Sequence, residues 1–217
     1  NEHGGAQFDR NRLVGITAGR VVNYAGTFDA SSWCAGKDVL IVGPGDEART
    51  KKVELEQFIA QHKPVVIGLG AFSAINPSLI DAVAICHPER AALEATAISQ
   101  LQCPVFAPSA LLNELDITTK QPRDVGVAIN DAGFSLAPTQ ATLPRLLSAA
   151  NALALAAQGG AKRILVAGFD GFSPDDHRFQ EMDDVFAKFA QLANAPQVVS
   201  ITRTRFNIER SSMFAPL

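Results

Sequence analysis

The stretch Lys37-Asp-Val-Leu-Ile-Val-Gly-Pro-Gly45 decides the fold. Its apolar run Val39–Val42 is typical of a strand buried on both faces of a sheet. The turn Gly43-Pro44-Gly45 follows directly, and Glu47–Gln61 then places its apolar residues on one side of a predicted helix. A strand, a glycine turn and a helix in this order predict the first unit of a parallel α/β sheet.

The same alternation continues to the end of the chain. Further apolar runs predict strands at Val65–Leu69, Ala82–Cys86, Val105–Phe106, Val125–Ile129, Ile164–Ala167 and Val198–Ile201. Helices are predicted over Thr142–Gln158 and from Ser173 onward, where Ser173 suits the N-cap and Pro174 the first helical position. Because crossovers between parallel strands are right-handed, we expect a three-layer, Rossmann-like, doubly wound and mainly parallel sheet.

Length and charge narrow the class of protein. The chain has 217 residues, of which 47% are hydrophobic, and this is enough for one domain with a sizeable core. A net charge of -3 without a Lys/Arg cluster gives no electrostatic footprint for nucleic acid. No apolar run approaches the roughly 20 residues that span a membrane. We therefore expect neither nucleic acid nor membrane as a partner, whereas assembly into a homo-oligomer stays open.

Cysteines and the first residues suggest where the chain resides and how it is organised. Cys34, Cys86 and Cys103 are three widely spaced cysteines, which argues for structural thiols in a reducing cytoplasm rather than a disulfide framework. Residues 1–36 show no clear periodicity of apolar residues, and the chain has no initiator Met. We predict an N-terminal arm or linker remnant over residues 1–36, a domain over 37–217, and an origin in a longer polypeptide.

In doubly wound sheets, ligands bind beyond the carboxyl ends of the strands. The turn Gly43-Pro44-Gly45 is therefore the first candidate for binding a nucleotide cofactor, since glycine permits a close backbone approach and free N–H groups at a helix start favour phosphate. Asp46 and Glu47 can instead simply cap that helix, and they would repel a phosphate unless a divalent metal such as Mg²⁺ accompanies it. Gly68–Gly70, at the end of the next strand, is predicted to form the far wall of the pocket or a plain loop.

Later loops supply the candidate catalytic groups. His87 can act as a general acid or base beside Arg90, although the same segment also reads as a helix start. Asp170, between two glycines, suits a ribose hydroxyl, a metal or an Asx turn. His177 is a second candidate base or an exposed helix residue.

Two hydroxyl residues complete the candidates. Thr202 and Thr204 alternate with arginines after the last predicted strand, which suits an anionic group or a solvated loop. No set of side chains has the spacing of a dedicated protein metal site, so Mg²⁺ would enter only together with a nucleotide.

Three segments together resemble a known family. Lys37–Gly45 looks like the opening of Rossmann-like domains whose first loop reads G-P-G-P-S, although Asp46 and Glu47 replace the final Pro-Ser. Ile164–Gly171 resembles their late strand and loop, and Ser200–Thr204 resembles their closing segment. The family is the C-terminal domain fused to HMG-CoA lyase-like, or 4-hydroxy-2-oxovalerate aldolase-like, barrels. Bacterial sialyltransferases and hydroxymethylpterin diphosphokinases are more distantly similar.

This resemblance implies a pocket for a nucleotide or nucleotide-sugar built from Gly43, Gly45, Gly68–Gly70 and Asp170. It also implies an upstream aldolase barrel as a partner. Three functions stay open: a nucleotide- or nucleotide-sugar-binding domain with group transfer, a non-catalytic accessory domain of an aldolase-type lyase, and, as the last of the three, an NAD(P)-dependent oxidoreductase. The last would need an acidic residue at the end of the second strand, where the sequence has Gly68-Leu69-Gly70 instead.

Overall fold

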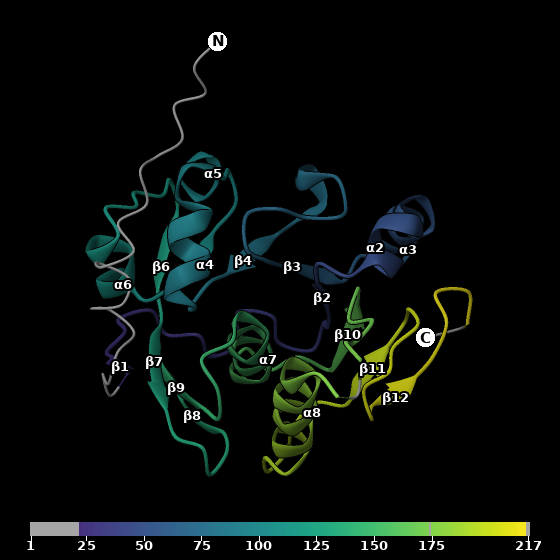
Figure 1. The fold of residues 1–217 in the computed structure, drawn as a ribbon. Coiled ribbons are helices and arrows are strands. Elements are labelled where there is room, and N and C mark those ends of the chain that lie inside the picture. Colours follow the sequence, from purple (N-terminus) through teal and green to yellow (C-terminus); the bar gives the residue numbers. More distant parts are fainter. Residues whose placement is uncertain (1–21, 174, 216–217) are drawn as a thin grey trace.

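A computed structural model of the chain describes residues 22–173 and 175–215 (Figure 1). Its main strands are β2 (Asp38–Val42), β3 (Val65–Leu69), β4 (Ala82–Ala84), β5 (Val105–Ala107), β6 (Pro122–Asp124), β10 (Arg163–Ala167), β11 (Val198–Ser200) and β12 (Glu209–Arg210). They form one parallel sheet in the order β12-β11-β10-β2-β3-β4-β5-β6. The predicted doubly wound, mainly parallel sheet is confirmed, with the change of direction between β2 and β10.

Helices cover both faces of this sheet (Figure 1). The first face carries α2 (Asp46–Thr50), α3 (Lys52–His62), the 3₁₀ helix η1 (Pro77–Leu79), α4 (Pro88–Leu93), α5 (Ala95–Gln100) and α6 (Ser109–Glu114). The second face carries α7 (Ser148–Gln158) and α8 (His177–Ala190). The three layers expected from the sequence are therefore present.

Alternate side chains of the buried strands form the two halves of the core. In β2, Val39 and Ile41 belong to the cluster that contains the apolar residues of α7 and α8. Leu40 and Val42 point to the opposite face and pack with Leu55 and its neighbours on α3. A strand that is apolar at every position is therefore satisfied on both faces, as a covered parallel strand requires.

A second, small sheet was not predicted. It consists of β1 (Asn23–Tyr24), β7 (Gly126–Ile129), β8 (Ser135–Ala137) and β9 (Gln140–Leu143) in the order β1-β7-β9-β8. The prediction that Val125–Ile129 belongs to the main sheet is wrong, because the chain leaves that sheet after β6. At this crossing a Cβ on Gly126 would lie 2.8 Å from the backbone nitrogen of Gly26, so glycine permits the close approach.

Several predicted helix boundaries shift. The helix expected over Thr142–Gln158 begins only at Ser148, because Gln140–Leu143 pairs with β7 as strand β9. The helix expected over Glu47–Gln61 is divided into α2 and α3 at Lys51. The predicted N-cap at Ser173 is wrong, since α8 begins at His177 and Asp176 caps it. Pro174 lies outside the described residues.

Part of the predicted N-terminal arm packs on the domain. Ala30 and Cys34 are buried in the main core, and the indole N–H of Trp33 donates to the carbonyl oxygen of Leu155 at 2.9 Å. Residues 1–21 lie outside the described part of the chain, so the boundary after Gly36 stays a prediction. Cys34 and Cys86 are buried free thiols, whereas Cys103 is half-buried in the loop before β5. Within residues 22–173 and 175–215, no helix combines the length and apolar character that crossing a bilayer needs.

Candidate functional site

A cleft of about 790 Å³ lies beyond the carboxyl ends of the central strands. Its walls come from the loops after β2, β4, β10 and β11, the end of β3, helix α4 and the first turns of α7 and α8. The point between β2 and β10, where the chain changes its direction across the sheet, opens into this cleft. The cleft therefore lies where doubly wound folds bind ligands.

The glycine turn packs tightly against the loop after β10. The N–H of Gly43 donates to the carbonyl oxygen of Ala167 at 2.8 Å, and that of Gly45 to the carbonyl oxygen of Gly168 at 2.9 Å. A Cβ on Gly45 would lie 2.5 Å from both the Gly168 oxygen and Oδ1 of Asp170. The glycines are thus required by a neighbouring loop of the same chain, whereas Pro44, Gly45 and Asp46 line the cleft.

Asp170 occupies a position at which the sequence predicts a phosphate. Its Oδ2 accepts a hydrogen bond from the backbone N–H of Glu47, in the first turn of α2, at 3.0 Å. Its Oδ1 is buried and has no hydrogen-bond partner among the described residues. A carboxylate of the chain therefore already satisfies this N–H at the start of α2, so this N–H is not available to a phosphate.

His87 also lines the cleft. It precedes Pro88, the first residue of α4, and its Nδ1 is buried without a partner in the described part of the chain. Burial lowers the pKa of His87 below the ordinary value of 6.5, while Glu89 and Glu181 raise it and Arg90 lowers it. The neutral imidazole, which can accept a proton, is therefore favoured at neutral pH.

Arg90 and Glu94 fix the wall at the end of β3. Arg90 Nε donates to Glu94 Oε1 at 2.8 Å, and Arg90 Nη2 donates to the carbonyl oxygen of Leu69 at 3.2 Å. The backbone N–H of Ala71 donates to Glu94 Oε2 at 2.6 Å. Gly70 has a φ of +82°, and a Cβ there would lie 2.5 Å from that same Glu94 oxygen.

Of the segment Gly68–Gly70, which the sequence predicts as the far wall of the pocket or a plain loop, only the middle residue reaches the cleft. Leu69 lines the cleft, whereas Gly68 and Gly70 are not among its lining residues. Gly70 provides the backbone conformation that lets Ala71 reach Glu94. Gly68 lies in β3, where a Cβ would make only ordinary contacts with Ile80 and Val83.

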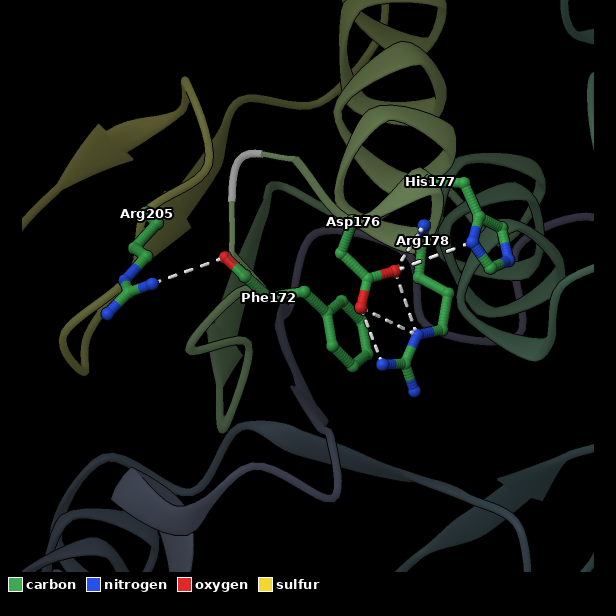
Figure 2. Close-up of polar contacts among 5 residues, drawn as sticks. All are labelled: Phe172, Asp176, His177, Arg178 and Arg205. Atoms are coloured by element: carbon green, nitrogen blue, oxygen red, sulfur yellow. Dashed lines mark hydrogen bonds and ion pairs between the residues drawn. The ribbon is translucent and has the colours of Figure 1, made fainter.

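Figure 2 shows a polar cluster at the start of α8. The Arg178 guanidinium lies 4.1 Å from the ring centre of Phe172, and both residues line the cleft. Asp176 accepts three hydrogen bonds from the Arg178 side chain, two from Nε at 3.0 and 3.2 Å and one from Nη2 at 2.6 Å. These bonds, with the Arg178 backbone N–H, lower the pKa of Asp176 to about 2.

His177 lies outside this cleft lining. Its side chain is 80% exposed, and its Nδ1 lies 3.6 Å from Asp176 Oδ1 (Figure 2). The structure therefore brings His87 and Asp170 together in one cleft but places His177 beside it, on the exposed first turn of α8. An exposed imidazole is the alternative that the sequence left open.

Thr202 and Thr204 are buried, and their hydroxyl groups accept hydrogen bonds from backbone N–H groups. Thr202 Oγ1 accepts the N–H of Gly168 at 3.0 Å, and Thr204 Oγ1 accepts the N–H of Phe206 at 3.2 Å. Neither residue lines the cleft. In this structure they shape the loops behind Asp170, so a direct contact with an anion stays a prediction.

Carboxylates outnumber guanidinium groups in the cleft lining. The acidic side chains are Asp46, Glu89, Glu94, Asp170 and Glu181, and the guanidinium groups are Arg90 and Arg178. Each of these two arginines is already paired with a carboxylate. Across the described residues, no group of three or more His, Cys, Asp or Glu side chains is arranged to hold a metal ion.

Sequence reasoning missed several lining residues because no motif marks them as part of a site. Leu93 is 72% exposed at the rim, and Phe172 and Met182 supply further apolar wall. Ser148 reaches the cleft from the first turn of α7, a helix whose start was placed six residues too early. The Arg90–Glu94 pair did carry a signal, since opposite charges four residues apart in a helix lie side by side.

Comparisons with known proteins give a structural neighbour and no family. No model of a protein family and no curated protein matches the sequence. The MAf glycosyltransferase from Magnetospirillum magneticum AMB-1 matches with a TM-score of 0.57 and 10% sequence identity. The match covers 91% of this chain but only 37% of the glycosyltransferase chain. At this identity the likeness concerns the fold, and it agrees with a Rossmann-like α/β domain.

Proposed function

We propose that this chain binds a nucleotide or nucleotide-sugar in the cleft and transfers a group from it. The observation that carries the proposal is the pair of buried polar atoms without partners among the described residues, His87 Nδ1 and Asp170 Oδ1. They come from loops after two different strands yet belong to one cleft at the switch point. Unpartnered buried polar atoms are rare in folded proteins, and each one calls for an explanation such as a catalytic role or a bound water or ion. The glycosyltransferase neighbour supports this choice of reaction class.

The size and lining of the cleft suit such a ligand. Pockets for small molecules measure roughly 300–1,000 Å³ and combine apolar walls with a few polar groups. Here Leu69, Leu93, Phe172 and Met182 provide the apolar walls. We place the base or another flat part of the ligand against these residues.

The phosphates would lie on the side of His87 and Arg90, because Asp170 already binds the N–H of Glu47. Five carboxylates in the lining disfavour a highly charged anion. We therefore expect a donor with few negative charges, or phosphates that enter with Mg²⁺. Magnesium is commonly held by one or two carboxylates and the substrate phosphates, so the lack of a three-residue cluster among the described residues is compatible with it.

Group transfer needs a base for the acceptor, and His87 fits this role. Its neutral imidazole would take the proton of an acceptor hydroxyl. The acceptor oxygen then bonds to the anomeric carbon of the donor, and the bond from that carbon to the phosphate oxygen breaks, leaving its electron pair on the nucleotide. The exposed position of His177 makes it the weaker candidate base.

Thermal-shift and calorimetric titrations test the proposal. The probes are CMP, CDP, ADP, ATP, GTP, NAD and UDP-glucose, each with and without Mg²⁺, since a ligand that binds only the folded state raises Tm. Leu93→Glu adds a negative charge at the exposed rim without disturbing the core, and we expect it to weaken nucleotide binding by roughly tenfold. Val53→Glu is the matched control, because Val53 is also exposed on a helix but lies outside the cleft lining.

Each possible result of these titrations leads to a different conclusion about the nucleotide site. Binding that Leu93→Glu weakens and Val53→Glu leaves unchanged supports the cleft as the nucleotide site. No Tm shift and no heat with any of the probes would refute nucleotide binding. Gly45→Asp is a poor probe of the site, because any side chain at Gly45 collides with Asp170.

A second candidate is a non-catalytic accessory role, in which the same edge contacts an upstream aldolase barrel or another copy of the chain. The observation in its favour is apolar exposure at the cleft and in the loop after β3: Leu93 is 72% and Phe72 67% exposed. Sedimentation velocity of the wild type and Phe72→Ser tests self-association through this edge. The NAD(P) alternative has the least support, because β3 ends at Leu69 and is followed by Gly70, and the nearby carboxylate of Glu94 is already bound by Ala71 and Arg90.

A further inference from the structure

The two carboxylate oxygens of Asp170 have different surroundings. Oδ2 is 3.0 Å from the backbone nitrogen of Glu47 and accepts its hydrogen bond. Oδ1 is buried, belongs to a residue that lines the cleft, and has no partner within the described part of the chain. A buried carboxylate oxygen without a donor is costly, so the unused acceptor needs an explanation.

The position of this carboxylate is fixed by its neighbours. The carbonyl oxygen of Asp170 accepts the N–H of Arg205 at 3.0 Å, which anchors the backbone. Gly168 and Gly171, on either side, have φ values of +72° and +88° and give the loop its shape. Oδ1 is therefore held in place before any ligand arrives.

The loop of Gly45 packs closely on Oδ1 without giving it a donor. A Cβ on Gly45 would lie 2.5 Å from this oxygen, so position 45 tolerates only glycine. The two guanidinium groups of the described cleft lining do not serve Oδ1 either, because Arg90 is paired with Glu94 and Arg178 with Asp176. No described residue therefore supplies a donor to Oδ1.

We infer that Asp170 Oδ1 accepts a hydrogen bond from a hydroxyl group of the bound ligand, so that Asp170 selects ligands with a hydroxylated sugar. This inference rests on the proposed function and names the part of the ligand that lies beside the glycine turn. Phosphates only accept hydrogen bonds and are repelled by a carboxylate, whereas a sugar hydroxyl is a neutral donor. The hydroxyl belongs either to the ribose of the nucleotide or to the transferred sugar.

Calorimetric titration of paired probes tests the inference and separates the two sources. CDP and ADP are compared with their 2′,3′-dideoxy counterparts, which lack the ribose hydroxyls. UDP-glucose is compared with UDP, which lacks the transferred sugar. Free ribose and glucose at high concentration, followed by thermal shift, provide a probe without phosphate.

Asp170→Asn is the informative variant. Its amide oxygen can still accept the N–H of Glu47, while an amide nitrogen replaces Oδ1 and turns the acceptor into a donor. Asp81→Asn is the matched control, because Asp81 Oδ2 also accepts a backbone N–H, that of Val66 at 2.8 Å, but lies outside this cleft lining.

We expect the wild type to bind the hydroxyl-bearing member of one pair more tightly, by roughly tenfold or more as for a hydrogen bond to a charged group. Asp170→Asn should largely remove that difference, whereas Asp81→Asn should keep it. Discrimination within the CDP and ADP pairs assigns the hydroxyl to ribose, and discrimination between UDP-glucose and UDP assigns it to the transferred sugar.

Other results overturn the inference or the proposed function separately. If the wild type binds both members of each pair equally well, the hydroxyl contact is wrong but nucleotide binding stands. The same holds if Asp170→Asn weakens both members of a pair equally, as the loss of a Mg²⁺ ligand would. Free sugars that stabilise the wild type but not Asp170→Asn, while no nucleotide binds, support the hydroxyl contact and refute the nucleotide site. If none of the probes binds the wild type, both are wrong.

Discussion

Oδ2 of Asp170 lies 3.0 Å from the backbone nitrogen of Glu47, although 123 positions separate the two residues in the chain. This hydrogen bond joins the loop after β10 to the first turn of α2, on the two sides of the switch point. It has two consequences. A carboxylate of the chain accepts a hydrogen bond from an N–H group that would otherwise attract an anion. In addition, Gly45 has to stay without a side chain, because the two loops meet there.

The first prediction concerns this close approach. Gly45→Ala should lower the free energy of unfolding by about 1–3 kcal/mol, because the new Cβ would lie 2.5 Å from a backbone oxygen that cannot rotate away. Gly68→Ala is the control, since its Cβ would be 3.5 Å from Ile80. Urea denaturation measures both. Equal stability of the two variants would show that the loops are not packed this closely.

A second prediction follows from the buried ring of His87. Because burial depresses its pKa, the neutral ring stabilises the fold fully above pH 6.5, and that contribution is lost as the pH falls below this value. His87→Gln cannot be protonated in this range, so its Tm should fall less than that of the wild type between neutral and mildly acidic pH. Thermal scans across this interval measure the difference, and parallel curves would contradict the depressed pKa.

The same group sets the expected pH dependence of transfer. If His87 is the base, the rate should fall as the pH drops through the lowered pKa of His87, which lies below 6.5. His87→Gln should reduce the rate by roughly 10²–10⁴-fold and remove this acidic limb. His177→Gln should change neither the rate nor the profile. A pH–rate profile with the nucleotide-sugar that binds in the titrations decides between the two histidines.

A fourth prediction separates two roles of Asp176. Its lowered pKa means that its stabilising contacts are complete above the ordinary value of 3.8 and are lost as the pH falls towards about 2. Asp176→Ala should lower Tm at neutral pH, because it removes both the N-cap bond to the Arg178 N–H and the ion pair. Asp176→Ser keeps a capping oxygen and loses only the ion pair. If both variants melt alike, the cap contributes little.

The fifth prediction concerns the thiols. Burial raises the pKa of Cys86 to about 12 and that of Cys34 to about 11, so neither forms a reactive thiolate near neutral pH. Cys103 is only half-buried, although burial also raises its pKa. In Ellman titration of the folded protein, Cys103 should react first, and the other two should react only after unfolding. Rapid reaction of all three would contradict the buried core around Cys34 and Cys86.

Part of this protein was determined by the sequence alone. Runs such as Val39–Val42 and Ile164–Ala167 are apolar at nearly every position, and only a strand covered on both faces satisfies them. Alternation of such runs with helices then predicts the parallel, three-layer sheet. These signals are local, because the pattern of burial is written in consecutive residues. Pro44, Gly45 and Asp170, which the sequence assigns to loops after strands, line the cleft, and their role in binding stays a prediction.

The tertiary structure decided the rest, because the deciding contacts join distant residues. Only strand pairing shows that Gly126–Ile129 leaves the main sheet and that Gln140–Leu143 forms strand β9 rather than the start of a helix. Only packing shows that Asp170 serves the N–H of Glu47, and that His87 faces the cleft while His177 faces solvent. The periodicity of apolar residues specifies which face of a helix or strand is buried, but it does not specify which loops pack against each other. The unused acceptor on Asp170 is therefore a property of the folded chain.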